Sequence, residues 1–211
     1  MNKSRARALS GPKRRSERGS VLVEAAATAT VFFTLLFGVL EAGFLMSDYL
    51  ATTSGARAAT RAATTKGNDA DADYAILRQI KREMSALPTS NIDQIIIFKA
   101  TGPGAAVPSA CLTAPLHQGI TNSGTNTYCN VYDRTDLTTA STKFGCTTVS
   151  TNYYDCGWDP KTRKVAVSTG VNPDYIGVYV RVTHPAITGF FLKSYTFSST
   201  VVYPLEPRAL A

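Results

Sequence analysis

The chain has 211 residues, of which 44% are hydrophobic and 9% aromatic, and a formal net charge of +7. This length and composition allow one globular core of ordinary size beside any membrane segment. The positive charge does not indicate nucleic-acid binding: the first 19 residues hold seven Lys or Arg against one Glu, a net charge of +6, which leaves +1 for everything after them.

A continuous apolar segment follows this basic leader and runs from Val21 to Met46. At about 1.5 Å per residue, a helix over this segment would be about 39 Å long, enough to cross a bilayer. Positive charge stays on the cytoplasmic side. We therefore expect a single-pass protein of a bacterial inner or cytoplasmic membrane, with its N-terminus cytoplasmic and its C-terminal domain outside. A cleaved secretory signal fits less well, because the run is long and contains Glu24 and Glu41.

The residues around Glu24 form a recognisable pattern. Gly19 is followed by Ser20, and Glu24 stands at the fifth position after the glycine. This pattern resembles a type IV prepilin cleavage site. Three stretches together resemble the TadE-like pilus-assembly proteins of the tight-adherence (Tad) system: RGSVLVEAA at 18–26, FGVLEAGF at 37–44 and SGARAATRAA at 54–63.

The resemblance implies a structural minor pilin, and we expect no catalytic activity, cofactor or metal. It implies cleavage by a prepilin peptidase between Gly19 and Ser20, and contact with other pilins, major and minor, through the N-terminal helix. The expected layout is therefore a cleaved leader at 1–19, a transmembrane helix at 20–46 and an extracytoplasmic domain at 47–211. Such a protein would take part in assembly, initiation or capping of a Tad-type pilus used for surface adhesion.

A charged carboxylate in an apolar helix costs at least a few kcal/mol, so Glu24 is expected to have a partner. Cleavage would create an ammonium at Ser20, on the same helix or a neighbouring one, that neutralises Glu24 and sets the subunit register. The alternative is that Glu24 reaches the cytoplasmic interface and favours the helix N-terminus. Glu41 is interpreted as an interfacial residue and a possible subunit contact.

Two helices are expected to precede the strands. The first continues beyond the membrane to about Lys66 and ends near Gly67. The second is predicted from about Asp71 to Leu87, with an apolar stripe and Pro88 after it. Its acidic start, DADAD at 69–73, is not a calcium loop, because the sixth and twelfth positions are not Gly and Glu. Helix capping is the favoured interpretation.

The rest of the chain favours strands. β-Branched or alternating residues predict strands at 92–100, 164–168, 176–184 and 195–202. In IGVYVRVTH the residues from Ile176 to Val182 on even positions share one face, which is expected to pack while the other is solvated. The prediction is an α+β fold in which two helices cover the inner face of an antiparallel sheet, a pilin-like layout.

A long loop is expected at 101–161, rich in Gly, Pro, Thr, Asn and Tyr, and it contains all four cysteines. Outside the cytoplasm these predict two disulfides, and short loops favour Cys111 with Cys129 and Cys146 with Cys156, although three connectivities are possible. A zinc site is disfavoured because the cysteines lack paired close spacings and would have to recruit His117 or His184.

Catalysis has no candidate residues, because the chain lacks the common nucleophile, zinc-protease and phosphate-loop motifs. His184 as a general base is less favoured than His184 as a turn residue before Pro185. The loop aromatics either form a contact patch or fill the gap between loop and sheet. The alternative function is a signal-anchored envelope binding protein that binds a ligand or surface through its cysteine-containing loop and does not enter a pilus.

Overall fold

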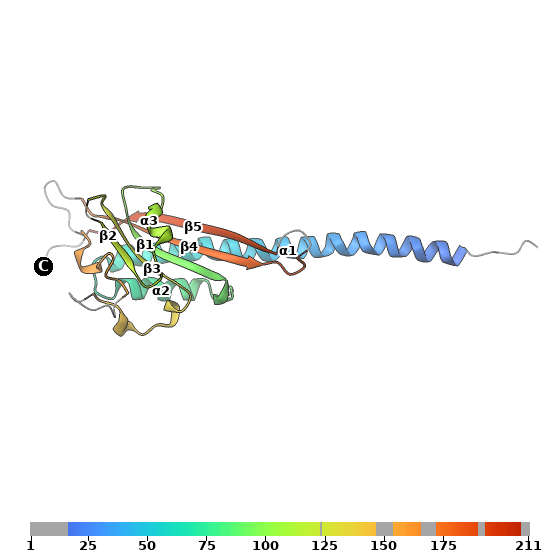
Figure 1. The fold of residues 1–211 in the computed structure, drawn as a ribbon, viewed down its shortest axis with the longest axis horizontal. Coiled ribbons are helices and arrows are strands. Elements are labelled where there is room, and N and C mark those ends of the chain that lie inside the picture. The colour runs from blue at the N-terminus through green and yellow to red at the C-terminus, as the bar shows by residue number, and fades with distance from the viewer. Residues whose placement is uncertain (1–16, 123, 147–153, 166–171, 190–192, 208–211) are drawn as a thin grey trace, which may run out of the picture. The chain divides into compact units, whose positions relative to one another are not determined.

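The computed structural model describes residues 17–122, 124–146, 154–165, 172–189 and 193–207 (Figure 1). The chain divides into two units, Met1–Ala42 and Gly43–Ala211. Helix α1, Glu17–Lys66, begins in the first unit and ends in the second. It ends where Gly67 adopts a left-handed conformation, with φ of 53°, and donates its N–H to the carbonyl of Ala63. The predicted long N-terminal apolar helix and its end are confirmed.

The first unit consists, within the described part, of the N-terminal half of α1. Its large apolar side chains are exposed from Val21 through Leu40. Thr30 and Thr34 donate their hydroxyls to carbonyls one turn earlier, at 2.9 and 2.8 Å, so these polar groups are satisfied inside the helix. The segment Gly19–Lys66 is long and apolar enough to cross a membrane. These features suggest a single-pass membrane anchor.

The second unit contains a five-stranded antiparallel sheet with the order β2-β3-β1-β4-β5 (Figure 1). The α+β fold class predicted from the sequence is confirmed. The strands are β1 Ile92–Ala100, β2 Gly119–Asn122, β3 Thr127–Tyr132, β4 Tyr175–Pro185 and β5 Ser194–Pro204. The remaining elements are α2 Ala72–Glu83, α3 Ser109–Thr113, and the short 3-10 helices η1 Thr89–Asn91, η2 Asp136–Thr138, η3 Ser141–Lys143 and η4 Pro160–Thr162.

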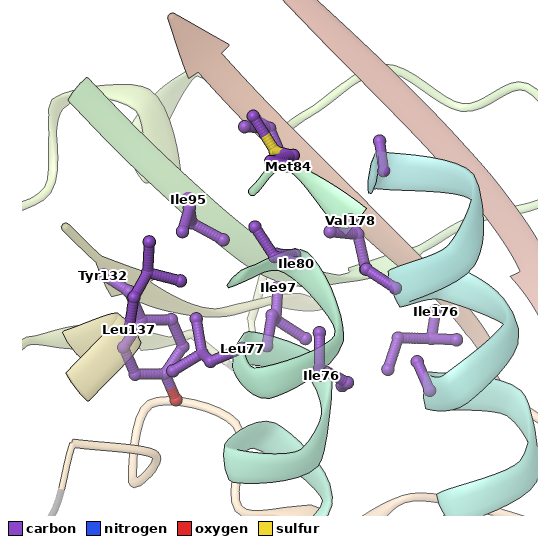
Figure 2. Close-up of a cluster of buried hydrophobic side chains, with 14 of the residues drawn as sticks. Ile76, Leu77, Ile80, Met84, Ile95, Ile97, Tyr132, Leu137, Ile176 and Val178 are labelled. Atoms are coloured by element: carbon purple, nitrogen blue, oxygen red, sulfur yellow. The ribbon is translucent and has the colours of Figure 1, made fainter. Parts of the chain in front are cut away.

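The main core lies between one face of the sheet and two helices, α1 and α2. Figure 2 shows Ile76, Leu77 and Ile80 of α2 on the side of the helix that faces β1, the strand that carries Ile95 and Ile97. From β4 the even-numbered residues Ile176 to Val182 are buried in the same cluster, as their alternation predicted. From α1 only alanines join it, at positions 56, 59 and 63, which lets this helix approach the sheet closely.

The opposite face of the sheet is covered in part, which differs from the solvated face expected. Phe98, Val131 and Tyr179 form a second buried cluster with both cysteines of one disulfide. The segment around α3 packs over it through Val107 and Ala114. Tyr179 is 8% exposed as a result. The residues that cover this face belong to the stretch at 101–161, which was expected to be a long loop.

Three other boundaries differ from the prediction. Helix α2 ends at Glu83, four residues before the predicted end, because the chain leaves the helix in a turn in which Leu87 donates its N–H to the carbonyl of Met84. Met84 and Leu87 are still buried. The stretch at 101–161 is not one long loop, since it contains α3, the β2–β3 hairpin and three 3-10 helices. Of the strand expected at 164–168, Lys164 and Val165 are not in a strand, and 166–168 lie outside the described residues.

Candidate functional site

The residues of the expected processing site lie at the start of α1. Gly19, Ser20 and Glu24 are all helical and exposed. Ser20 and Glu24 are four positions apart in a continuous helix, a spacing at which two groups lie on the same face, one turn apart. Of the leader predicted at 1–19, residues 1–16 lie outside the described residues.

Glu24 stands on a helix face with small side chains. Ala25, Thr28 and Ala29 lie beside it, and Phe32 continues the same face one turn farther on. Small residues let a second helix approach closely, and a carboxylate among them provides the polar group around which such a contact can be oriented. Glu41, the second glutamate of the apolar region, lies in α1 near the end of the first unit.

The structure contains two disulfides, Cys111–Cys129 and Cys146–Cys156. The first joins α3 to β3 and holds the α3 segment against the sheet. The second joins two points 10 residues apart, ahead of η4. Because all four cysteines are in disulfides, none offers a thiolate for metal binding.

A buried polar network joins α2, β3 and the segment around η4. Asp73 is fully buried: one carboxylate oxygen accepts hydrogen bonds from the Asn130 amide at 2.7 Å and the Tyr132 hydroxyl at 2.8 Å, and the other contacts the Arg163 guanidinium at 2.6 Å. Arg163 also lies over the ring of Trp158, 4.5 Å from its centre. The network connects three segments that are far apart in the sequence.

Helix capping, the interpretation given to the aspartates at 69–73, is therefore wrong for two of them. Asp71 occupies the N-cap position, but its side chain makes no capping hydrogen bond and instead pairs with Lys66 at 3.2 Å. Asp73 faces the protein interior. The reason is the phase of α2, whose buried stripe includes position 73 together with Ile76, Leu77 and Ile80.

Asp155 lies beside this network and is also buried. One carboxylate oxygen accepts the backbone N–H of Gly145 at 2.7 Å, while the other has no hydrogen-bond partner among the described residues. Burial, followed by the nearby negative charge of Asp73, raises the pKa of Asp155 from 3.8 to about 6. Burial also raises the pKa of Tyr132 well above its ordinary value.

The two histidines occupy different environments. His184 is not a turn residue: it lies within β4, is buried, and its Nδ1 is 2.7 Å from Asp48 of α1. His117 lies between α3 and β2, with Nδ1 3.1 Å from a carboxylate oxygen of Asp136. Asp133 follows directly after β3, and its ligand atom lies within 4.8 Å of those of His117 and Asp136. Sequence reasoning missed this grouping, because the residues are separated along the chain.

The carboxyl groups near His117 titrate differently. Burial raises the pKa of Asp136. Burial also acts to raise the pKa of Asp133. Hydrogen bonds from Thr135 and the charge of His117 outweigh this effect, so the pKa of Asp133 is lowered from its ordinary value.

The loop aromatics mostly pack inward. Tyr132 and Trp158 are buried in the main core, and Tyr128 and Tyr154 pack against it while partly buried. The gap-filling interpretation therefore holds for these residues, and Tyr153 lies outside the described part. Tyr128 and Trp158 also line a pocket of about 500 Å³ that includes the ion pair between Lys99 and Asp174, 3.2 Å apart.

The comparisons with known proteins give one match. Residues 19–61 match the family model described as TadE-like protein. No curated protein and no solved structure matches the chain. The matched segment covers Gly19, Ser20, the glutamates of the apolar region and two of the three α1 alanines in the main core, Ala56 and Ala59. Proteins of this family are associated with the Tad pilus and are structural rather than catalytic. The match over residues 19–61 supports the identification of this chain as a TadE-like protein of the Tad system.

Proposed function

We propose that this protein is a structural minor pilin, without enzymatic activity, that takes part in assembly, initiation or capping of a Tad-type pilus. The observation that carries the proposal is the placement of Glu24. It is the fifth residue after Gly19, near the start of an exposed apolar helix, in a segment that matches the TadE-like family model. The protein is inserted with its N-terminus cytoplasmic and its folded unit outside.

Processing between Gly19 and Ser20 by a prepilin peptidase prepares the helix for assembly. It removes the basic leader and leaves an ammonium at Ser20, one helical turn from Glu24. An isolated carboxylate in the apolar region is unfavourable, so subunits associate in the register that brings Glu24 and an ammonium together. The small residues beside Glu24 allow the helices of neighbouring pilins to approach closely.

The first test is the N-terminal residue of the membrane-extracted protein, read by intact mass in cells with and without the prepilin peptidase. We expect a chain that begins at Ser20 only when the peptidase is present. A chain that keeps its leader in both strains contradicts the processing step.

The second test is Glu24→Gln, which removes the charge and keeps the side-chain shape. Loss of even about 1.4 kcal/mol of pairing energy reduces subunit incorporation about tenfold. Quantitative immunoblotting measures incorporation as the ratio of the protein in sheared pili to the protein in the membrane fraction. Glu83→Gln, at the end of α2, is the matched control and is expected to incorporate normally. Equal incorporation of both variants contradicts the role given to Glu24.

The alternative function is a signal-anchored envelope binding protein, and one observation favours it. The pocket of about 500 Å³ beside Tyr128 has the size of a small-molecule site and combines an aromatic ring with charged and amide groups. An uncleaved bond between Gly19 and Ser20, with normal pili after deletion of the gene, would favour this function over the minor pilin.

A further inference from the structure

Three side chains with metal-ligating atoms meet at one end of the β2–β3 hairpin. His117 precedes β2, Asp133 follows β3, and Asp136 begins η2. Each offers one ligand atom, and these atoms lie within 4.8 Å of one another. Ligands around a single tetrahedral ion with bonds of about 2.1 Å lie about 3.4 Å apart. His117 Nδ1 and Asp136 Oδ1 are already 3.1 Å apart, and the most distant pair would close by up to about 1.4 Å, which side-chain rotation can supply.

Two of these ligand atoms lack the hydrogen bonds that buried polar atoms normally make. His117 Nδ1 and Asp136 Oδ1 are both buried and have no hydrogen-bond partner among the described residues. They are 3.1 Å apart, yet not in hydrogen-bonding geometry with each other. Asp136 is fully buried, and its Oδ1 has the ion-pair contact with His117 but no hydrogen bond among the described residues, which is costly for a buried carboxylate. A cation held between the two atoms would satisfy both.

The backbone around the cluster is already ordered by hydrogen bonds. The N–H of His117 donates to the carbonyl of Val131 at 2.9 Å, which anchors the residue to β3. Asp136 accepts the N–H of Asp133 at 2.9 Å through its other oxygen, so Oδ1 remains available. Arg78 of α2 donates to two carbonyls in and beside η2 and holds that turn against the helix. The backbone that carries His117 and Asp136 is therefore held in place by these hydrogen bonds without a metal ion.

We propose that His117, Asp133 and Asp136 bind a divalent transition-metal ion of the zinc type. One imidazole nitrogen and two carboxylate oxygens form a three-ligand set that leaves a fourth position for water. The imidazole favours zinc and its neighbours over calcium or magnesium, which prefer oxygen ligands. The side chain of His117 is 35% exposed although its Nδ1 is buried, so the cluster lies close to the surface.

Bound metal links the segment before β2 to the segment after β3. It adds a third connection within a region that the disulfides already hold, and it neutralises a buried carboxylate. This inference is independent of the proposed pilin function, because it concerns the second unit alone.

The test is isothermal titration of the full chain in detergent with zinc chloride, using a purification tag without histidine. We expect one zinc ion per chain and weaker or no binding of calcium and magnesium. His117→Asn removes the imidazole, and asparagine tolerates the left-handed conformation that His117 adopts, with φ of 59°. We expect it to weaken zinc binding at least about tenfold. His184→Asn is the matched control, since it removes the only other histidine, and is expected to bind zinc as the wild type does.

A second variant and a second measurement distinguish loss of the metal site from misfolding. Asp133→Asn should also weaken zinc binding at least about tenfold. Zinc should raise the unfolding temperature of the wild type and of His184→Asn, but not that of His117→Asn. Absence of saturable zinc binding to the wild type overturns the proposal. Equal losses in His117→Asn and His184→Asn overturn it as well.

Discussion

Raising the pH should destabilise the second unit through Asp155. This carboxyl is buried, and one of its oxygens lacks a hydrogen-bond donor among the described residues. Its pKa in the folded protein is about 6, above the ordinary value of 3.8. A group whose folded pKa is raised binds its proton more tightly in the folded state. Its contribution to stability is fully present below about pH 3.8 and is lost as the pH rises through 6.

The magnitude follows from the size of the shift. A rise of about two pKa units corresponds to about 3 kcal/mol between the two protonation states. Asp155→Asn stays neutral at every pH, and its amide oxygen can still accept the N–H of Gly145. We therefore expect the variant to match the wild type near pH 4 and to be more stable by about 3 kcal/mol near pH 8.

The assay is denaturant unfolding of the full chain in detergent, followed by tryptophan fluorescence between pH 4 and pH 8. Trp158 is the only tryptophan in the chain and is buried in the main core, so it reports on this unit directly. Other groups in the protein also titrate, so the informative quantity is the difference between variant and wild type at each pH. Asp71→Asn is the control, because its carboxylate is exposed at the surface.

Two results would refute this reasoning. Parallel stability curves for wild type and Asp155→Asn would mean that burial does not raise the pKa of this carboxyl. A similar pH-dependent difference in Asp71→Asn would mean that the effect is not specific to the buried site.

Two further predictions concern stability, each with a control and each measured by the same unfolding assay. Arg163→Met leaves the charge of Asp73 buried without its cationic partner and should lower the free energy of unfolding by about 3–5 kcal/mol. Arg181→Met removes the partner of Asp93 in an ion pair where the Arg181 side chain is 39% exposed, and should lower it by less than about 1 kcal/mol. Similar losses in the two arginine variants would contradict this. Gly119→Ala places a methyl group against the backbone of the neighbouring loop and should cost about 1–3 kcal/mol, whereas Gly102→Ala, with open space around it, should be nearly neutral. A stable Gly119 variant would show that this close approach can relax.

The sequence alone was sufficient for the features that depend on local pattern. A long, mostly apolar run behind a basic leader predicts a membrane helix, because length and hydropathy are properties of the segment itself. The alternation in IGVYVRVTH likewise predicted a strand with one buried face, and β4 has that face. The motif around Gly19 and Glu24 was recognisable for the same reason, since its spacing lies within one stretch of chain.

Tertiary structure decided the features that depend on partners distant in the sequence. Strands β2 and β3 are short and partly polar, so their pattern is weak, and they become strands by pairing with each other and with β1. Asp73 resembled a helix-start residue, but the phase of α2 against the sheet turns it inward to meet Arg163, 90 residues away. His117 and Asp136 come together only when the hairpin closes, because no spacing along the chain encodes that contact.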